Sequence, residues 1–145
     1  MLFTGKDFVI IDFEGEPARP LSERRLKRSP IQDVAGMIRS FHYAAFTTLR
    51  QHGTLAGKTE EDEAFVLEQW RKFWYLWASA AFLRSYRETI DPRGLVPVGT
   101  EDFRILLDAY LLDKAIYEIG YEPNHRPSWV GVPIRGILSL LADSG

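Results

Sequence analysis

Two carboxylates near the N-terminus are the residues with the clearest chemical potential in this sequence. Asp12 and Glu14 come directly after Phe8-Val9-Ile10-Ile11, an apolar and β-branched run that is typical of a strand buried on both faces. Because residues two apart in an extended segment share a side, both carboxylates would point the same way while Phe13 packs in the other direction. Magnesium in proteins prefers one or two carboxylates together with substrate phosphates. The pair is a candidate magnesium site, and the alternative is an aspartate that ends a strand and starts a turn.

A second candidate site lies on a predicted helix where aromatic rings and charges share one stripe. Residues 103–121 place apolar side chains at three- and four-residue spacing, and the early ones are typical of a helix packed on a core. The later part of the stripe mixes rings with charged groups: Lys114, Tyr117, Glu118 and Tyr121. A sugar needs both kinds of group, since apolar surface meets its C–H side and polar groups bind its hydroxyls. The alternative is a helix that leaves the core with its lysine extended along the surface.

A cluster of cations follows the candidate magnesium site: Arg19, Arg24, Arg25, Lys27 and Arg28. Side chains of this kind at this density can bind phosphate groups or an acidic partner. The residues alone favour the other interpretation, which is a solvated loop whose charge is balanced by neighbouring glutamates.

Further along, aromatic residues form a stripe on another predicted helix: Trp70, Phe73, Trp74, Trp77 and Phe82. We expect this stripe to pack in the core. His42 falls beside the apolar stripe of the preceding helix, and we expect it to be packed or capped. A zinc site is not expected, because the sequence has no cysteine and its three histidines are scattered.

The elements that position these groups are predicted from turn and helix-boundary residues. The segment Thr4-Gly5-Lys6-Asp7 is typical of a tight hairpin turn in which glycine takes a positive φ. Ser29-Pro30 opens a helix that ends near residue 52, and acidic first turns open two more, over about residues 59–89 and 100–120. Prolines at 123 and 127 are expected to break the chain before a last short helix over about residues 132–141. The predicted fold is mainly α, with a short N-terminal β-hairpin and about four helices.

Composition restricts the class of protein. The 145 residues suit a single domain over residues 1–145, and 46% hydrophobic and 26% charged residues are typical of a folded globular chain. The net charge of −2 gives no bulk electrostatic reason to expect nucleic acid or an anionic membrane as partner. No apolar run approaches the length of a membrane span, and the absence of cysteine suits a reducing compartment, so we expect a cytoplasmic protein.

Several stretches of the chain resemble bacterial maltokinases, which also occur fused to trehalose synthase. The N-terminal stretch over residues 7–17 carries the resemblance together with the arginine-rich continuation over residues 19–37. Near the other end, Leu111-Leu112-Asp113-Lys114-Ala115-Ile116-Tyr117-Glu118 and residues 121–129 resemble the same family.

This resemblance implies a fold like the C-terminal lobe of aminoglycoside phosphotransferases and protein kinases. It implies transfer of the γ-phosphoryl group of ATP to the anomeric hydroxyl of maltose. Asp12 matches the aspartate that holds magnesium against the ATP phosphates, while Glu14 stands where protein kinases have a glycine and would lie beside the metal. The family's maltose pocket maps onto residues of the last predicted long helix and beyond, with the final three less directly supported: Lys114, Tyr117, Tyr121, Glu118, Arg126 and Trp129.

The family also has features that are missing from these 145 residues. Maltokinases carry a His-Gly-Asp catalytic loop just upstream of the hairpin, and an N-terminal lobe that clamps ATP. We therefore expect the chain to be the C-terminal lobe, to contain no catalytic base, and to turn over negligibly by itself. The rival hypothesis is a non-catalytic helical docking module that holds a fused or partner trehalose synthase.

Overall fold

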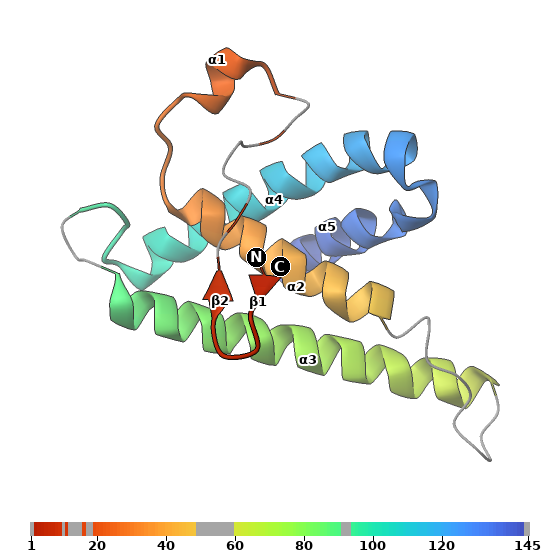
Figure 1. Ribbon diagram of the computed structural model, residues 1–145. Coiled ribbons are helices and arrows are strands. Elements are labelled where there is room, and N and C mark those ends of the chain that lie inside the picture. Colours follow the sequence, from red (N-terminus) through yellow and green to blue (C-terminus); the bar gives the residue numbers. More distant parts are fainter. Residues whose placement is uncertain are drawn as a thin grey trace.

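A short hairpin and a set of helices make up the computed structural model, which describes residues 2–9, 11, 16, 19–48, 60–90 and 94–143. Within these ranges the elements are, in chain order, β1 (Leu2–Phe3), β2 (Phe8–Val9), α1 (Leu21–Arg24), α2 (Ile31–Thr48), α3 (Glu60–Thr89), α4 (Thr100–His125), the 3₁₀-helix η1 (Pro127–Trp129) and α5 (Gly131–Asp143) (Figure 1). The predicted fold class, mainly α with a short N-terminal hairpin, is confirmed; α1 is an additional single turn. None of the described helices combines the length and apolarity needed to cross a membrane.

The hairpin has the predicted turn but not the predicted burial. Strands β1 and β2 pair antiparallel, the backbone N–H of Thr4 donates to the carbonyl of Asp7 at 2.8 Å, and Gly5 has a φ of +92°. The expectation of a strand buried on both faces is wrong, because Phe8 and Val9 are 60% and 48% exposed. A sheet of only two strands leaves side chains on both of its faces open to solvent.

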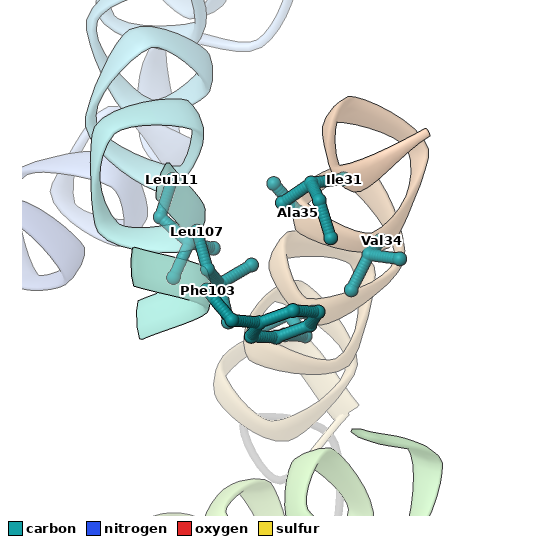
Figure 2. Close-up of a cluster of buried hydrophobic side chains, with 7 residues drawn as sticks. Ile31, Val34, Ala35, Phe103, Leu107 and Leu111 are labelled. Atoms are coloured by element: carbon teal, nitrogen blue, oxygen red, sulfur yellow. The ribbon is translucent and has the colours of Figure 1, made fainter. Parts of the chain in front are cut away.

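Helix α2 lies at the centre of the core. Its N-terminus is capped as predicted, with the Ser29 hydroxyl accepting from the backbone N–H of Ile31 at 3.3 Å. The buried cluster joins one face of α2 to one face of α4: Ile31, Val34, Ala35, Ile38, Phe103, Leu107 and Leu111. Figure 2 shows these two sets of side chains pointing toward one another. Both sets repeat every three or four residues, as a helix with one apolar stripe requires.

The aromatic stripe of α3 contradicts its predicted core role. Trp70 and Trp77 are each 61% exposed and Phe73 is 53% exposed, whereas Phe82 is partly buried with its ring edge-on to Phe41. Apolar side chains cover both faces of α3, and α2 packs against only one of them. The tryptophans therefore stay outside because the described chain has no second layer to cover them.

Helix α4 continues past the proline that was expected to end it. The predicted end at Gly120 is wrong, since α4 runs through Pro123 to His125. The cause is Glu122, which is 1% exposed and accepts hydrogen bonds from the hydroxyl of Tyr43 at 2.9 Å and from Arg126 at 2.7 Å. These contacts hold the last turn although the proline removes one backbone donor. After η1 the chain returns as α5, which lies beside α4 (Figure 1).

Candidate functional site

One face of α4 forms an open groove with the segment that precedes α1. Its volume is about 440 Å³, within the range of ligand pockets (about 300–1,000 Å³). We call it the α4 groove and define it by the residues that line it: Arg19, Asp113, Ile116, Tyr117, Gly120, Tyr121, Asn124 and His125. It therefore combines aromatic rings, an amide and charged groups on one surface.

A column of rings occupies the middle of the groove. Tyr117, Tyr121 and His125 are four residues apart, so they lie above one another on the helix surface. The tyrosine ring centroids are 6.1 Å apart with 17° between the planes, and His125 lies 3.8 Å from Tyr121 with 5° between the planes. The faces of Tyr121 and His125 meet, and the charged groups of Lys114 and Arg19 lie beside the Tyr117 ring, so the column offers hydroxyl groups and ring edges to a ligand rather than one broad flat face.

Two ion pairs attach the segment before α1 to the N-terminal side of the groove. Glu16 pairs with Lys114, and Arg19 donates to Asp113 at 2.8 Å. Both cations also lie beside the Tyr117 ring, with Lys114 Nζ at 5.2 Å and Arg19 Cζ at 5.7 Å from its centroid. Glu16, Arg19 and Lys114 are largely buried and Asp113 is about half exposed, so the two pairs hold Glu16 and Arg19 against α4.

The opposite face of α4 carries a buried ion pair with α2. Glu118 accepts from Nη2 and Nε of Arg39 at 2.7 and 3.0 Å. Burial raises the pKa of Glu118, and the hydrogen bonds and charge of Arg39 oppose that rise. Gly136 of α5 leaves room for the guanidinium, since a Cβ there would lie 2.0 Å from Nη1 of Arg39.

His42, which is also on α2, contacts the guanidinium of this ion pair. It is buried against the rings of Phe46 and Tyr75, as the sequence predicts for a packed histidine. Burial, followed by the charges of Arg39 and Arg135, lowers the pKa of His42 to about 3. The ring is therefore neutral at pH 7, and its Nδ1, 3.2 Å from Nη1 of Arg39, must be the accepting nitrogen.

A second polar cluster closes the C-terminal end of α4. Glu122 binds Tyr43 and Arg126, and the Arg126 guanidinium carbon lies 4.3 Å from the centroid of the Trp129 ring. The Trp129 ring is 5.9 Å from that of Tyr43. Burial and the nearby carboxylates of Glu118 and Glu122 raise the pKa of Tyr43, so its hydroxyl keeps its proton and donates it to Glu122.

The structure divides the predicted sugar-binding residues into two groups. Tyr117 and Tyr121 line the α4 groove, and Lys114 lies beside it; the second group, Glu118, Arg126 and Trp129, belongs to the polar clusters on the α2 side. The predicted metal ligands Asp12 and Glu14 lie outside the described residues. Among the residues that are described, no group of three or more histidine, cysteine or carboxylate side chains could hold a metal ion.

Several residues of these clusters were not identified from the sequence. Asp113 and His125 lie one helical turn before Tyr117 and one after Tyr121, so extending the tyrosine spacing by a turn in each direction would have found them. Arg19 was predicted only as a member of a basic loop, and its pairing with Asp113 depends on how that loop folds back. Arg39 and Glu122 gave no signal, because neither stands in a recognisable chemical pattern.

Comparison with known proteins gives a distant relationship. The chain matches no protein-family model. It is 28% identical over 142 residues to a glucosamine kinase of Streptacidiphilus jiangxiensis, covering 94% of this chain and 28% of that protein. It is also 28% identical over 144 residues to a glucosamine kinase of Mycolicibacterium smegmatis, covering 99% of this chain and 32% of that protein. The chain thus spans about a third of the length of these relatives, and the relationship it shows is a kinase-like one with sugar kinases.

Proposed function

We propose that the chain forms the sugar-binding part of an ATP-dependent sugar kinase whose acceptor is maltose or a related disaccharide. The α4 groove is the observation that carries this proposal, because Tyr117 and Tyr121 line it and Lys114 lies beside it, paired with Glu16 of the segment that follows Asp12 and Glu14 in the sequence. The names of the two relatives support phosphoryl transfer to a sugar. The resemblance to maltokinases supports a disaccharide.

The proposed roles follow from the chemistry of each group. Asp12 would hold Mg²⁺ with the ATP phosphates and Glu14 would lie beside it, since two carboxylates fit the ligand preference of this ion. When bound, Mg²⁺ neutralises charge on the β- and γ-phosphates. The hydroxyls of Tyr117 and Tyr121 and the ammonium of Lys114 would hydrogen-bond the sugar and hold it still. The general base is not assigned to any residue of this chain.

The charges of the groove favour a neutral sugar over glucosamine. Asp113 is the carboxylate among the groove-lining residues, and it is already paired with Arg19. The ammonium of glucosamine would have to displace that guanidinium, whereas sugar hydroxyls can bind the tyrosines and Asn124 with both ion pairs intact.

Binding is tested by titrating the isotope-labelled chain with maltose, glucosamine and cellobiose while NMR spectra are recorded. We expect maltose to shift resonances of Tyr117, Tyr121 and Asn124. Tyr117→Phe, Tyr121→Phe and Lys114→Met should each weaken the shifts. Lys72→Met, on the exposed side of α3, is the matched control for Lys114→Met and should leave the shifts unchanged. Equal shifts with all three sugars would remove the proposed acceptor preference.

Catalysis is tested on a longer chain of the length of the relatives, with Mg²⁺ and ATP. We expect phosphorylation of maltose that is lost in Asp12→Asn, and negligible turnover by the 145-residue chain. A longer chain that phosphorylates glucosamine but not maltose would support the sugar-kinase function and overturn the proposed disaccharide acceptor. A longer chain that phosphorylates neither sugar would overturn the kinase itself.

The second candidate function is a non-catalytic docking module for trehalose synthase. The observation that favours a docking role is the exposed aromatic surface of α3. Co-sedimentation of the chain with trehalose synthase, together with absence of any sugar shift, is the outcome expected of this alternative.

A further inference from the structure

The outward face of α3 carries a regular line of residues that are apolar except for an arginine at its C-terminal end. We call it the α3 seam and define it by six residues: Val66, Trp70, Phe73, Trp77, Ala80 and Arg84. Their spacing alternates between four and three residues, which is the heptad pattern of helices that pair along their length. From Trp70 to Arg84 the seam is exposed to solvent, and its large side chains are more than half exposed.

The α3 seam points away from the rest of the described chain. Successive residues of a helix are about 100° apart, so all six seam residues lie within about 40° of the direction opposite Tyr75. The partly buried α3 residues that pack on the core are Tyr75, Phe82, Leu83 and Tyr86. The part of the seam from Trp70 to Arg84 is therefore available to a partner without any change in the fold.

The seam is complementary to itself in the antiparallel direction. Its positions are symmetric about residue 75, so a second α3 laid antiparallel with residue 75 aligned sets every seam residue opposite another one. Trp70 then faces the partner's Ala80, which puts a large side chain against a small one. Phe73 faces the partner's Trp77, and Val66 faces the aliphatic part of the partner's Arg84.

Charges at the helix ends favour the same orientation. Residues 60–63 at the start of α3 are all acidic, and Arg84 and Arg87 are in its last two turns. Antiparallel pairing brings the acidic first turn of each helix to the end of the other helix that carries the partner's Arg84, while Arg87 is turned toward Thr100 and Phe103 of its own chain. It also sets the positive end of one helix dipole beside the negative end of the other. A parallel pair would instead place like charges together at both ends.

The exposed apolar area of α3 lies at the lower end of the range that a stable interface buries. An aromatic side chain buries about 150–250 Å², and four of those on α3, Trp70, Phe73, Trp74 and Trp77, are about half exposed or more. With Phe65 and Leu76 beside them, this gives on the order of 600 Å² of apolar area per copy, against the roughly 800 Å² per partner of a standard interface. A patch of this size marks an interaction site.

The surface of the seam is also hollowed where a partner side chain would enter. A hollow of about 270 Å³ is lined by Phe65, Val66, Gln69, Trp70 and Phe73. Four of these five residues, Val66, Gln69, Trp70 and Phe73, have the spacing of the hole that receives a side chain from a facing helix. In the antiparallel alignment the hollow lies opposite the partner's Ala80 and the partner's Trp77.

We propose that two copies of this chain form a symmetric dimer in which their α3 seams pair antiparallel about residue 75. The dimer leaves the α4 groove of each copy open, because the groove is built on α4 and the segment before α1. This inference does not depend on the proposed kinase function, and its test uses no sugar or nucleotide.

Disulfide cross-linking tests the orientation, since the chain has no cysteine of its own. Trp70→Cys and Ala80→Cys chains, one of them ¹⁵N-labelled, are mixed and oxidised, and the products are weighed by mass spectrometry. We expect the mixed disulfide to form at least about tenfold faster than either homodimeric one, because identical positions in an antiparallel pair are about 15 Å apart along the axis. Self-cross-linking of each variant alone would indicate a parallel pair and overturn the proposal.

Sedimentation equilibrium tests the interface itself. Wild-type protein should reach twice the 16.7 kDa mass of one chain, and Phe73→Glu should raise the dissociation constant at least about thirtyfold. Leu138→Glu is the matched control, because Leu138 on α5 is as exposed as Trp77 but lies outside the seam. A monomeric wild-type chain, or equal weakening by both variants, would overturn the proposal.

The same cross-linking on a longer chain of the relatives' length tests whether something other than a second copy covers the seam. A mixed disulfide there supports the dimer in the longer protein too. A longer chain that stays monomeric would show that its own remaining residues cover the seam. Dissociation of the dimer when trehalose synthase is added would assign the seam to that protein. Either of these results overturns the proposal.

Discussion

Removal of Arg39 is the substitution with the clearest expected consequence. The Arg39 side chain is 3% exposed and the Glu118 side chain 9% exposed, and Nη2 of Arg39 lies 2.7 Å from the Glu118 carboxylate. Arg39→Met keeps much of the side-chain length but leaves Glu118 buried without its cation. Breaking a buried pair in this way costs about 3–5 kcal/mol of unfolding free energy. For a chain of this size the melting temperature should fall by roughly 10 °C.

The size of this loss should depend on pH. Burial raises the folded-state pKa of Glu118 above its ordinary value, so the folded protein holds this proton more tightly than the unfolded chain does. A raised pKa contributes stability at low pH that is lost as pH rises through the folded-state value. In Arg39→Met the guanidinium no longer opposes this rise, so the folded-state pKa of Glu118 rises further. The stability that the raised pKa contributes then extends to higher pH. The variant should therefore lose less stability at pH 5 than at pH 8.

Urea unfolding followed by circular dichroism at both pH values measures this difference. Arg39→Met combined with Glu118→Gln should recover much of the loss, because the uncompensated charge is removed. Arg104→Met is the control, since Arg104 and its partner Glu101 are both more than half exposed and the substitution should change stability little. A loss below about 1 kcal/mol at pH 8, the range of an exposed pair, would refute the idea that Glu118 and Arg39 form a buried ion pair.

Three further predictions concern the neighbouring groups. Gly136→Ala should destabilise by about 1–3 kcal/mol, because its Cβ would lie 2.0 Å from the Arg39 guanidinium; a double-mutant cycle with Arg39→Met should show that the effects are not additive. The pKa of His42, lowered to about 3, contributes stability above pH 6.5 that is lost as pH falls toward 3, so His42→Phe should flatten the acid side of the urea-midpoint profile. Glu16→Gln and Lys114→Met should each increase amide hydrogen exchange at Glu16 and Arg19, with a coupling of a few tenths to about 1 kcal/mol in the double-mutant cycle, because the pair is partly exposed.

The elements that could be predicted from the sequence are those determined by neighbouring residues. The Thr4–Asp7 turn depends on a glycine within it, and the start of α2 depends on Ser29 and Pro30, so both follow from local chemistry. The core stripe of α2 follows from the spacing of its apolar residues, because α2 has one clear polar side.

The features that could not be predicted depend on contacts distant in sequence. Pro123 does not end α4, because Glu122 is anchored by Tyr43 from another helix. Helix α3 is apolar on both faces, so its sequence alone cannot determine which face packs on α2. Glu118 follows Tyr117 directly, yet the rotation of about 100° per residue in a helix places Tyr117 in the α4 groove and Glu118 against α2.

The close spacing of Tyr117 and Glu118 has a mechanical consequence for ligand binding. Rolling α4 about its axis to meet a ligand in the groove would pull Glu118 and Glu122 out of their buried partners on the other side. Each lost charge contact is expensive in a dry environment, so the backbone of α4 is preorganised and only side-chain tips are free to adjust. The groove therefore discriminates among ligands by how well they fit a fixed spacing of hydroxyls and rings, rather than by moulding itself around them.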